Sequence, residues 1–273
     1  MAHDSKIEWT GDTLPTQAGC RNASPGCINC YARILSERLA AMSAAKRARG
    51  EDPGRLFKYE GTVKNGKWTG VVNLDHAALD EPLKRRKPTI YFADSMSDCF
   101  LPAVPRDFNE AKFRMFAQTP RHTYQVLTKH PKEMAKFIAS TKHANLPNVW
   151  LGVTVEDVRR KSRINVLSEI PAAVRFLSIE PLLEDLGELD LRGIDWLIIG
   201  GESGPKARPF DPKWARSILK QARAARVPVF VKQMGSNPVG LSLEDSKGGD
   251  IEEWPNSLQV RRMPAPPEAT NES

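Results

Sequence analysis

The sequence predicts a parallel β/α fold, as a complete or partial barrel of the TIM type. Three observations support this: short apolar segments recur along the chain, helical patterns lie between most of them, and almost every apolar segment ends in a polar or charged residue. Consecutive apolar positions are typical of strands buried on both faces. Alternation of such strands with helices predicts a parallel sheet with right-handed crossovers. A doubly wound open sheet is the second candidate, because the spacing of the units fits either architecture.

Seven strands are expected. The first is Lys6–Thr10, which precedes the first helical pattern. Six apolar, β-branched segments follow: Thr89–Asp94, Thr123–Lys129, Asn148–Glu156, Val174–Pro181, Asp195–Ser203 and Val227–Gly235. The connection between Pro181 and Asp195 is too short for a full helix, so one crossover is expected to be abbreviated.

Three helices are the clearest between these strands. The stretch Tyr31–Gly50 is helical in composition, and Pro105–Pro120 carries Phe108, Lys112 and Phe116 at a spacing of four. Asp211–Arg226 opens with Asp and then Pro, which are favoured at the N-cap and in the first turn of a helix. Its apolar residues fall on one face, as expected for a helix that covers a sheet.

The domain prediction is one β/α barrel over residues 1–263, with an insertion at about 49–73. That insertion contains Asn65–Gly66 between β-forming residues, which is a hairpin signal. The last ten residues, Pro264–Ser273, are rich in Pro and polar residues and are expected to be disordered.

Composition restricts the class of protein. The 273 residues are 40% hydrophobic and 27% charged, a balance typical of globular proteins. No run of about 18 apolar residues is present, so no membrane span is expected, and the N-terminus lacks the apolar stretch of a secretion signal. A cytoplasmic location is therefore expected, where clustered cysteines bind metal or act in redox chemistry more often than they form disulfides. The net charge of +7 is compatible with nucleic-acid binding.

Three of the four cysteines lie in GCRNASPGCINCYA, residues 19–32, with the spacing C-x6-C-x2-C. Three interpretations remain open. Cys20, Cys27 and Cys30 could hold zinc with a fourth ligand such as Cys99 or a histidine; Cys27 and Cys30 alone could act as a redox dithiol; or the three could hold a [4Fe–4S] cluster with one open iron. Their place on the loop after the first barrel strand favours the cluster, because catalytic groups gather at the carboxyl ends of barrel strands.

Polar residues at the predicted strand ends point to the same face. They are Asp94, Lys129, Glu156, Glu180, Glu202 and Lys232. Strands commonly become polar where they leave the core, which explains one or two of these residues. Acidic or basic residues at all six strand ends favour a functional site at the face where these strands end.

The chain resembles the phage-associated Gp37/Gp68-type proteins, a family of unknown function that looks like a divergent branch of the radical S-adenosylmethionine barrel enzymes. The segments that carry the resemblance cover nearly the whole chain in the family's order. They are KIEWT at 6–10, the cysteine stretch at 19–32, YFADSMSDCF at 91–100, VLTKHP at 126–131, NVWLGVTVE at 148–156, VRFLSIEPLL at 174–183, DWLIIGGESGPKARPFDPKW at 195–214 and VFVKQMG at 229–235.

The resemblance implies cofactors and site residues. Cys20, Cys27 and Cys30 would hold a [4Fe–4S] cluster whose open iron takes S-adenosylmethionine, which is cleaved to a radical that abstracts hydrogen from substrate. The methionine moiety or ribose would be bound by Glu180, Gly200, Gly201, Glu202 and Lys232. The residues expected to face substrate are Asp94, Ser95, Asp98 and Lys129.

The sequence departs from the wider pattern in three ways. The superfamily commonly has C-x3-C-x2-C, and members of the resembled family often carry WNP before the first cysteine and His after the SDxF motif, where this chain has LPTQ at 14–17 and Leu101. The predicted function is an iron–sulfur, radical-SAM-like enzyme that acts on nucleic acid or a nucleotide-like substrate. The basic runs Lys84–Lys87 and Arg159–Arg163 are candidate phosphate contacts.

An alternative hypothesis is a noncatalytic protein that binds zinc or an iron–sulfur cluster and recognises nucleic acid or a protein partner. The resemblance also implies a separately encoded protein partner.

Overall fold

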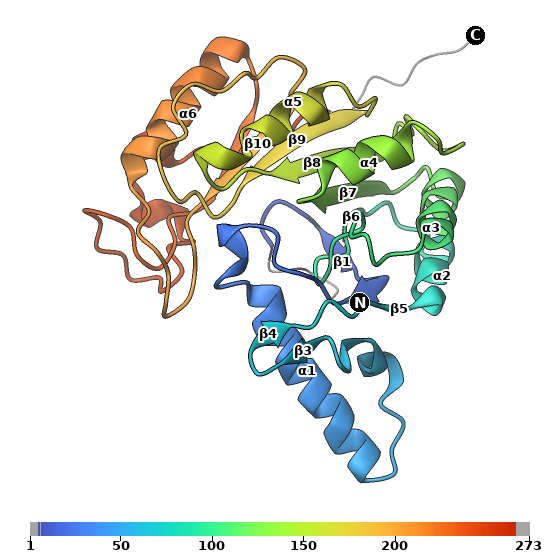
Figure 1. Cartoon of the computed structure of the whole chain (residues 1–273). Helices are drawn as coiled ribbons and strands as arrows, with labels where there is room; N and C mark the ends of the chain where they lie inside the picture. The colour runs from blue at the N-terminus through green and yellow to red at the C-terminus, as the bar shows by residue number, and fades with distance from the viewer. Residues whose placement is uncertain (1–4, 6, 266–273) are drawn as a thin grey trace. The chain divides into compact units, whose positions relative to one another are not determined.

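The computed structural model describes residue 5 and residues 7–265 of the chain. It divides into two compact units, unit 1 over Met1–Ala144 and unit 2 over Asn145–Ser273. Each unit contains parallel strands that alternate with helices, and both are drawn in Figure 1. The predicted tail Pro264–Ser273 lies almost wholly outside the described residues.

Unit 1 contains three parallel strands in the order β1-β6-β7. They are β1 (Asp12–Leu14), β6 (Ile90–Ala93) and β7 (Thr123–Thr128). Helix α3 (Arg106–Gln118) connects β6 to β7, and α4 (Pro131–Ile138) follows β7. The core of this unit is aromatic: Tyr91 stacks on Tyr124, and Phe116 stacks on the other face of Tyr124.

Unit 2 contains four parallel strands in the order β8-β9-β10-β11. They are β8 (Val149–Thr154), β9 (Val174–Ile179), β10 (Trp196–Gly200) and β11 (Val229–Gln233). The short 3-10 helix η4 (Val158–Arg160) and α5 (Ser162–Ser168) follow β8, and α6 (Pro212–Ala225) follows β10. No α-helix lies in the described connection from β9 to β10, which confirms the abbreviated crossover. Two 3-10 helices, η5 (Ile251–Glu253) and η6 (Asn256–Leu258), come after β11.

These strands and helices confirm the predicted fold class, a partial parallel β/α barrel. The prediction for the first strand was wrong in position: the described part of Lys6–Thr10 is a turn, and β1 begins at Asp12. Trp9, the bulky apolar residue of this stretch, lies in the turn and is buried without being part of a strand. Its ring packs against Phe92 with centroids 4.8 Å apart.

The region between β1 and β6 holds the predicted insertion. It comprises β2 (Gln17–Ala18), α1 (Tyr31–Ala48), the 3-10 helix η2 (Gly54–Tyr59), β3 (Val63–Lys64), β4 (Lys67–Trp68), β5 (Asn73–Leu74), η3 (His76–Leu79) and α2 (Asp80–Lys84). The hairpin is confirmed: Asn65 and Gly66 join β3 to β4 with φ of 51° and 65°, as a type I′ turn requires. Strand β2 pairs antiparallel with β5, so the chain before the cysteine loop meets the end of the insertion.

Among the described helices, none is both long and apolar enough to cross a membrane.

Candidate functional site

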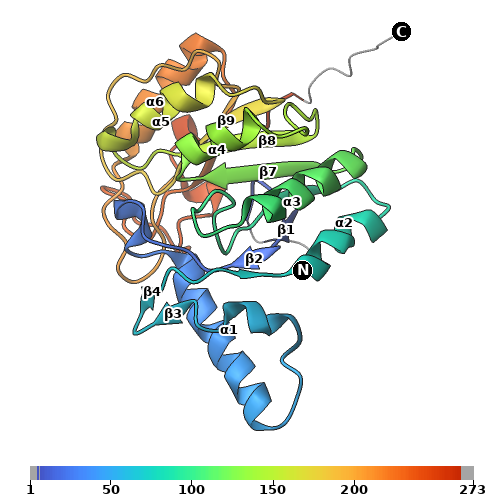
Figure 2. The ribbon, with the colours of Figure 1, turned by 45° about the vertical axis from the view of Figure 1, so that its right-hand side comes forward.

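The three clustered cysteines lie on the loop from β2 to α1, in unit 1. Figure 2 labels these two elements. Cys20 follows β2, Cys27 ends the 3-10 helix η1 (Pro25–Cys27), and Cys30 is the N-cap residue of α1. Pro25 starts η1 because its fixed φ suits the first helical position. The chain therefore turns twice within eleven residues. No disulfide joins the cysteines; Cys27 is buried, and Cys20 and Cys30 are half-buried.

The loop brings the three thiols within electrostatic range of one another. Burial raises the pKa of Cys20 well above its ordinary value, and the negative charges of Asp98, Cys30 and Cys27 raise it further. A charge acts on a neighbouring pKa only over a short distance. Three sulfurs and one carboxylate therefore share one part of unit 1.

The donor set of this loop is three thiols, a ligand type that zinc sites and iron–sulfur clusters share. Among the described residues, no group of three or more His, Cys, Asp or Glu side chains is arranged to hold one ion. The N–H of Ala23 donates to Cys27 Sγ at 3.5 Å, and the N-terminus of α1 begins at Cys30.

The fourth cysteine belongs to a different environment. Cys99 is fully buried, and its thiol donates to Asp94 Oδ2 at 3.0 Å. Burial raises the pKa of Cys99 far above its ordinary value, and the charge of Asp94 adds to this. The Cys99 thiol is thus engaged by the buried Asp94 carboxylate, which sets it apart from the three cysteines of the loop.

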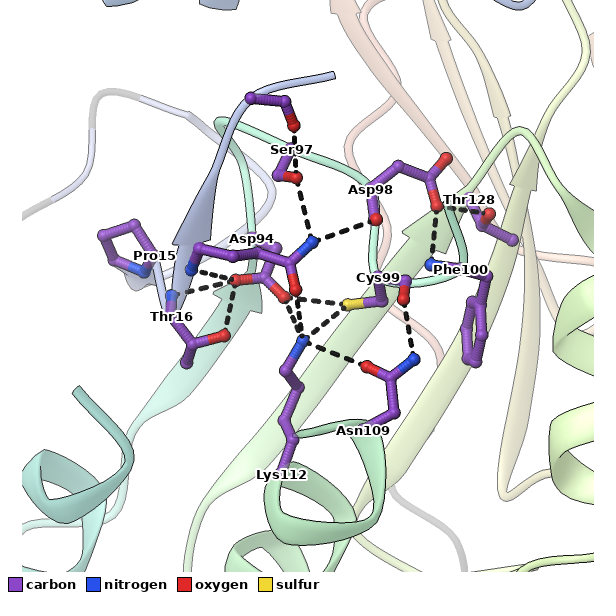
Figure 3. A network of polar contacts seen from close by, with 12 residues as sticks. Pro15, Thr16, Asp94, Ser97, Asp98, Cys99, Phe100, Asn109, Lys112 and Thr128 are labelled. Atoms are coloured by element: carbon purple, nitrogen blue, oxygen red, sulfur yellow. Dashed lines mark hydrogen bonds and ion pairs between the residues drawn. The ribbon is translucent and has the colours of Figure 1, made fainter. Parts of the chain in front are cut away.

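Asp94 is the centre of the buried network drawn in Figure 3. Its Oδ1 accepts from Thr16 N at 2.8 Å, from Thr16 Oγ1 at 2.7 Å and from Gln17 N at 3.2 Å. Its Oδ2 accepts from Lys112 Nζ, on α3, at 2.5 Å. The carboxylate at the end of β6 therefore fixes the chain just before the cysteine loop.

A second set of hydrogen bonds continues toward Cys20. Gln17 Nε2 donates to Ser97 Oγ at 2.9 Å and to the Asp98 carbonyl at 3.0 Å, and Ser97 Oγ donates to the Gly19 carbonyl at 2.6 Å. Gly19 has φ of 105°, and a Cβ there would lie 2.0 Å from the Val71 carbonyl oxygen. Only glycine fits this position, next to Cys20.

Two of the residues expected to face substrate are occupied within the protein. Asp94 is 2% exposed and serves the network above, so the structure assigns it a positioning role. Asp98 Oδ1 accepts from Thr128 Oγ1 at 2.6 Å, and its Oδ2 accepts from the N–H of Lys129 at 2.8 Å. Ser95 accepts at its carbonyl oxygen from the Tyr31 hydroxyl at 3.0 Å. Contact of Asp94, Ser95, Asp98 and Lys129 with substrate stays a prediction.

In unit 2 the structure brings together three of the residues predicted to bind S-adenosylmethionine. Glu180 follows β9, and its Oε1 lies 3.1 Å from Nζ of Lys232, on β11. A Cβ on Gly200, at the end of β10, would lie 3.0 Å from the same Oε1. The small residue at 200 leaves room for the Glu180 carboxylate. Lys232 and Glu180 remain 22% and 15% exposed, so a ligand can reach the pair.

Glu202 and Gly201 have other surroundings. Arg208 donates to Glu202 from its backbone N–H, from Nε and from Nη2, at 3.0, 2.9 and 2.6 Å. A Cβ on Gly201 would lie 2.2 Å from the Met234 carbonyl oxygen, so Gly201 permits close packing of backbone against backbone. Glu156, at the end of β8, is buried and accepts from Arg163 Nη1 at 3.0 Å.

Sequence reasoning missed Lys112, Gln17 and Arg208 as parts of these sites. Lys112 carried a signal, since it stands between Phe108 and Phe116 on the apolar face of its helix. A lysine on such a face indicates a buried partner of opposite charge. Gln17 and Arg208 lie in loops or short strands, where no periodic pattern marks them.

Parallel strands that alternate with helices, and one loop that gathers three thiols, define this chain as a β/α protein with a three-cysteine loop. It belongs to the family described as "Protein of unknown function (DUF5131)", which matches residues 4–253. The resemblance to the Gp37/Gp68-type proteins stays a prediction. The comparison with curated proteins finds no match.

Among solved structures the chain is similar to spore photoproduct lyases. Spore photoproduct lyase complexed with dinucleoside spore photoproduct is 11% identical, with a TM-score of 0.40, over 81% of this chain and 63% of that chain. A point variant is 10% identical, with a TM-score of 0.43, over 85% and 66% of the two chains. A third, with bound AdoMet and dinucleoside spore photoproduct, is 11% identical, with a TM-score of 0.42, over 81% and 63%. The chain thus spans less than two thirds of the length of these lyases.

Proposed function

We propose that the chain is an iron–sulfur enzyme of the radical S-adenosylmethionine type, with Cys20, Cys27 and Cys30 as the ligands of a [4Fe–4S] cluster. The observation that carries this proposal is the contrast between the cysteines. Three thiols share one loop of unit 1, whereas Cys99 is held by Asp94. A closed zinc site needs a fourth protein ligand, whereas a cluster on three thiolates has an iron free for a cofactor. When bound, such a cluster supplies an electron to S-adenosylmethionine.

The chain's own residues would prepare this site in two ways. The Asp94 network holds Thr16 and Gln17, so the loop that carries Cys20 is fixed before any metal arrives. The thiol of Cys20 is protonated near neutral pH because burial raises its pKa. Ligation therefore releases a proton, and loading is expected to be faster at higher pH.

In unit 2 the pair Glu180 and Lys232 supports S-adenosylmethionine binding. The methionine end of this cofactor carries an ammonium and a carboxylate, and its ribose carries two hydroxyls. A lysine ammonium suits the carboxylate, and a glutamate carboxylate accepts from the ammonium or the hydroxyls. We assign these roles to Lys232 and Glu180, with Gly200 leaving space beside them.

The proposed substrate is nucleic acid or a nucleotide-like molecule. The net charge is +7, and residues 31–73 hold nine Lys or Arg against four Asp or Glu, a local excess of +5. Phosphate groups are attracted by such a surface through release of their counterions. Lys64 and Lys67 are exposed on the β3–β4 hairpin of this region.

The test is anaerobic iron and sulfide analysis with electron paramagnetic resonance of the reduced protein, with and without S-adenosylmethionine. The proposal expects about four irons per chain and a spectrum that changes on addition of S-adenosylmethionine. The variant Cys20→Ser should lose the cluster, whereas Cys99→Ser is the matched control and should keep it. Zinc with no iron after anaerobic reconstitution would favour the noncatalytic alternative, in which the three cysteines are ligands of a structural zinc site.

A further inference from the structure

Helix α1 buries its small side chains and exposes its large ones. Ala32, Ser36 and Ser43 are buried, and none of them is larger than serine. On the opposite face, Met42 is 55% exposed and Tyr31 is 53% exposed. An ordinary surface helix has the reverse distribution, because burial of large apolar side chains stabilises its docking.

The exposed residues form a continuous stripe along the helix. Its members recur at spacings of three and four, so they lie on one face. They are Tyr31, Ile34, Leu35, Arg38, Ala41, Met42, Ala45 and Ala48, all of them exposed. We call this set the α1 stripe. Ile28, 60% exposed, precedes it in the cysteine loop.

The neighbouring elements of unit 1 leave this stripe uncovered. Helix α1 contacts η2 and β3, which lie beside it in Figure 1. Leu39 and Ala40 of the inner face of α1, together with Leu56 and Trp68, pack against a buried cluster that contains Ala32. Contiguous exposed apolar patches mark sites that interact with proteins, membranes or ligands.

The charge within the stripe restricts its partner. Arg38 is its one ionisable member apart from the Tyr31 phenol, and within the described residues it makes no ion pair. The surrounding region, residues 31–73, has the excess of +5 given above, of which Arg55 and Lys58 are paired with Asp75 just beyond it. We propose that the α1 stripe docks an amphipathic helix of another protein, whose apolar face carries a carboxylate opposite Arg38. This inference is independent of the cluster and of the proposed reaction.

A second copy of this chain suits the stripe less well. Arg38 stands near the middle of α1, which runs from Tyr31 to Ala48. A two-fold contact of two antiparallel α1 helices would place the two Arg38 guanidinium groups against each other. Like charges at the centre of an interface oppose association. A nucleic acid also fits poorly, since the stripe offers one cation among seven largely apolar side chains.

The test uses a synthetic helical peptide of about 18 residues, long enough to match α1, with leucines along one face and one glutamate at its middle. A second peptide carries lysine in place of that glutamate. Wild-type protein should bind the glutamate peptide roughly fivefold more tightly than the lysine peptide, the effect of one partly screened ion pair. The variant Arg38→Glu should reverse this preference. The variant Ile34→Glu should weaken binding of the glutamate peptide roughly tenfold or more.

The matched control is Leu83→Glu on α2, where the leucine is 44% exposed and outside the stripe. It should leave binding unchanged, and circular dichroism shows whether each variant is folded. Equal binding of the two peptides by wild type, or no effect of Arg38→Glu on the preference, would overturn the proposal. So would sedimentation showing a dimer that Ile34→Glu dissociates, or binding of a labelled oligonucleotide that the same variant abolishes.

Discussion

Lys112 Nζ lies 2.5 Å from Asp94 Oδ2, and the two side chains are 0% and 1% exposed. Burial lowers the pKa of Lys112, but the charge of Asp94 and its hydrogen bond with Lys112 outweigh this and leave it raised. Lys112 also donates to Gln17 Oε1 at 3.1 Å. One helix residue thus supports the carboxylate and the amide that hold the segment before Cys20.

Removal of Lys112 should therefore destabilise the protein strongly. The variant Lys112→Met leaves a buried carboxylate without its cation, which costs on the order of 3–5 kcal/mol in the free energy of unfolding. The double variant Lys112→Met/Asp94→Asn removes both charges and should recover more than half of that loss. Urea unfolding of the three proteins measures this. A single variant as stable as wild type would show that the pair contributes nothing.

The same pair makes a prediction about iron loading. If the network fixes the cysteine loop, the folded double variant should bind iron more slowly or more weakly than wild type, although all three ligand cysteines remain. Iron content after anaerobic reconstitution at matched protein concentration is the measurement. If the folded double variant binds iron as the wild type does, the network stabilises the fold but does not prepare the cysteine loop for iron.

Asp98 should control the reactivity of Cys20. Its charge is the largest contribution after burial to the raised pKa of the Cys20 thiol. The variant Asp98→Asn removes that charge, so the pKa of Cys20 should fall and its alkylation by iodoacetamide near pH 8 should become faster. Trypsin separates Cys20 from Cys27 and Cys30, because Arg21 lies between them. Mass spectrometry of the two peptides therefore follows Cys20 by itself. An unchanged rate for Cys20 would contradict the assignment of Asp98.

Much of the fold could be predicted from sequence because its strands are buried on both faces. The six later strands of the parallel sheet, β6 to β11, coincide with apolar runs, and the Asn65–Gly66 turn follows from local chemistry. The first strand could not be placed, because β1 has three residues and only Leu14 among them is apolar. Trp9 is buried although it lies in a turn, and a turn has no repeating pattern of apolar residues that the sequence could reveal.

The candidate site could be predicted only in part. The cysteine spacing marks the loop, and the polar residues after β6, β9 and β10 are where parallel strands place them. What these residues do depends on partners far away in sequence. Asp94 and Asp98 were expected at the substrate, yet Lys112 and Thr128 engage them from α3 and β7. No local pattern shows that a carboxylate is already occupied.

Gly19→Ala should disturb the cysteine loop more than an ordinary glycine substitution. Its Cβ would meet the Val71 carbonyl oxygen at 2.0 Å, and backbone cannot move aside cheaply. Gly61, with φ of 70° and no atom within 4 Å of the place a Cβ would take, is the control. Gly61→Ala should cost roughly 1–2 kcal/mol for the left-handed backbone alone. Gly19→Ala should cost more and also reduce iron loading. Equal effects of the two variants in urea unfolding would contradict the close approach.

The acid sensitivity of the insertion should depend on Asp75. Its carboxylate is 2% exposed, accepts from Lys58 Nζ at 2.9 Å and from Arg55 Nε at 2.8 Å, and thereby ties η2 to the start of η3. Burial raises the pKa of Asp75, but these two cations outweigh burial, so the net pKa lies below the ordinary 3.8. A carboxylate with a lowered pKa in the folded state stabilises that state above the pKa of the unfolded chain. The contribution is lost as pH falls through the folded pKa.

The free energy of unfolding of the wild-type protein should therefore decrease as the pH drops below about 4, where the Asp75 carboxylate of the unfolded chain begins to bind protons. The variant Asp75→Asn should be less stable at pH 7, since Lys58 loses its buried partner, and its stability should change less with acid over the same range. The difference between the two proteins isolates Asp75 from the other carboxylates. Urea midpoints at pH 7, 5, 4 and 3 give that difference, which should shrink as the pH decreases. A difference that stays constant with pH would show that the charge of Asp75 does not stabilise the folded chain.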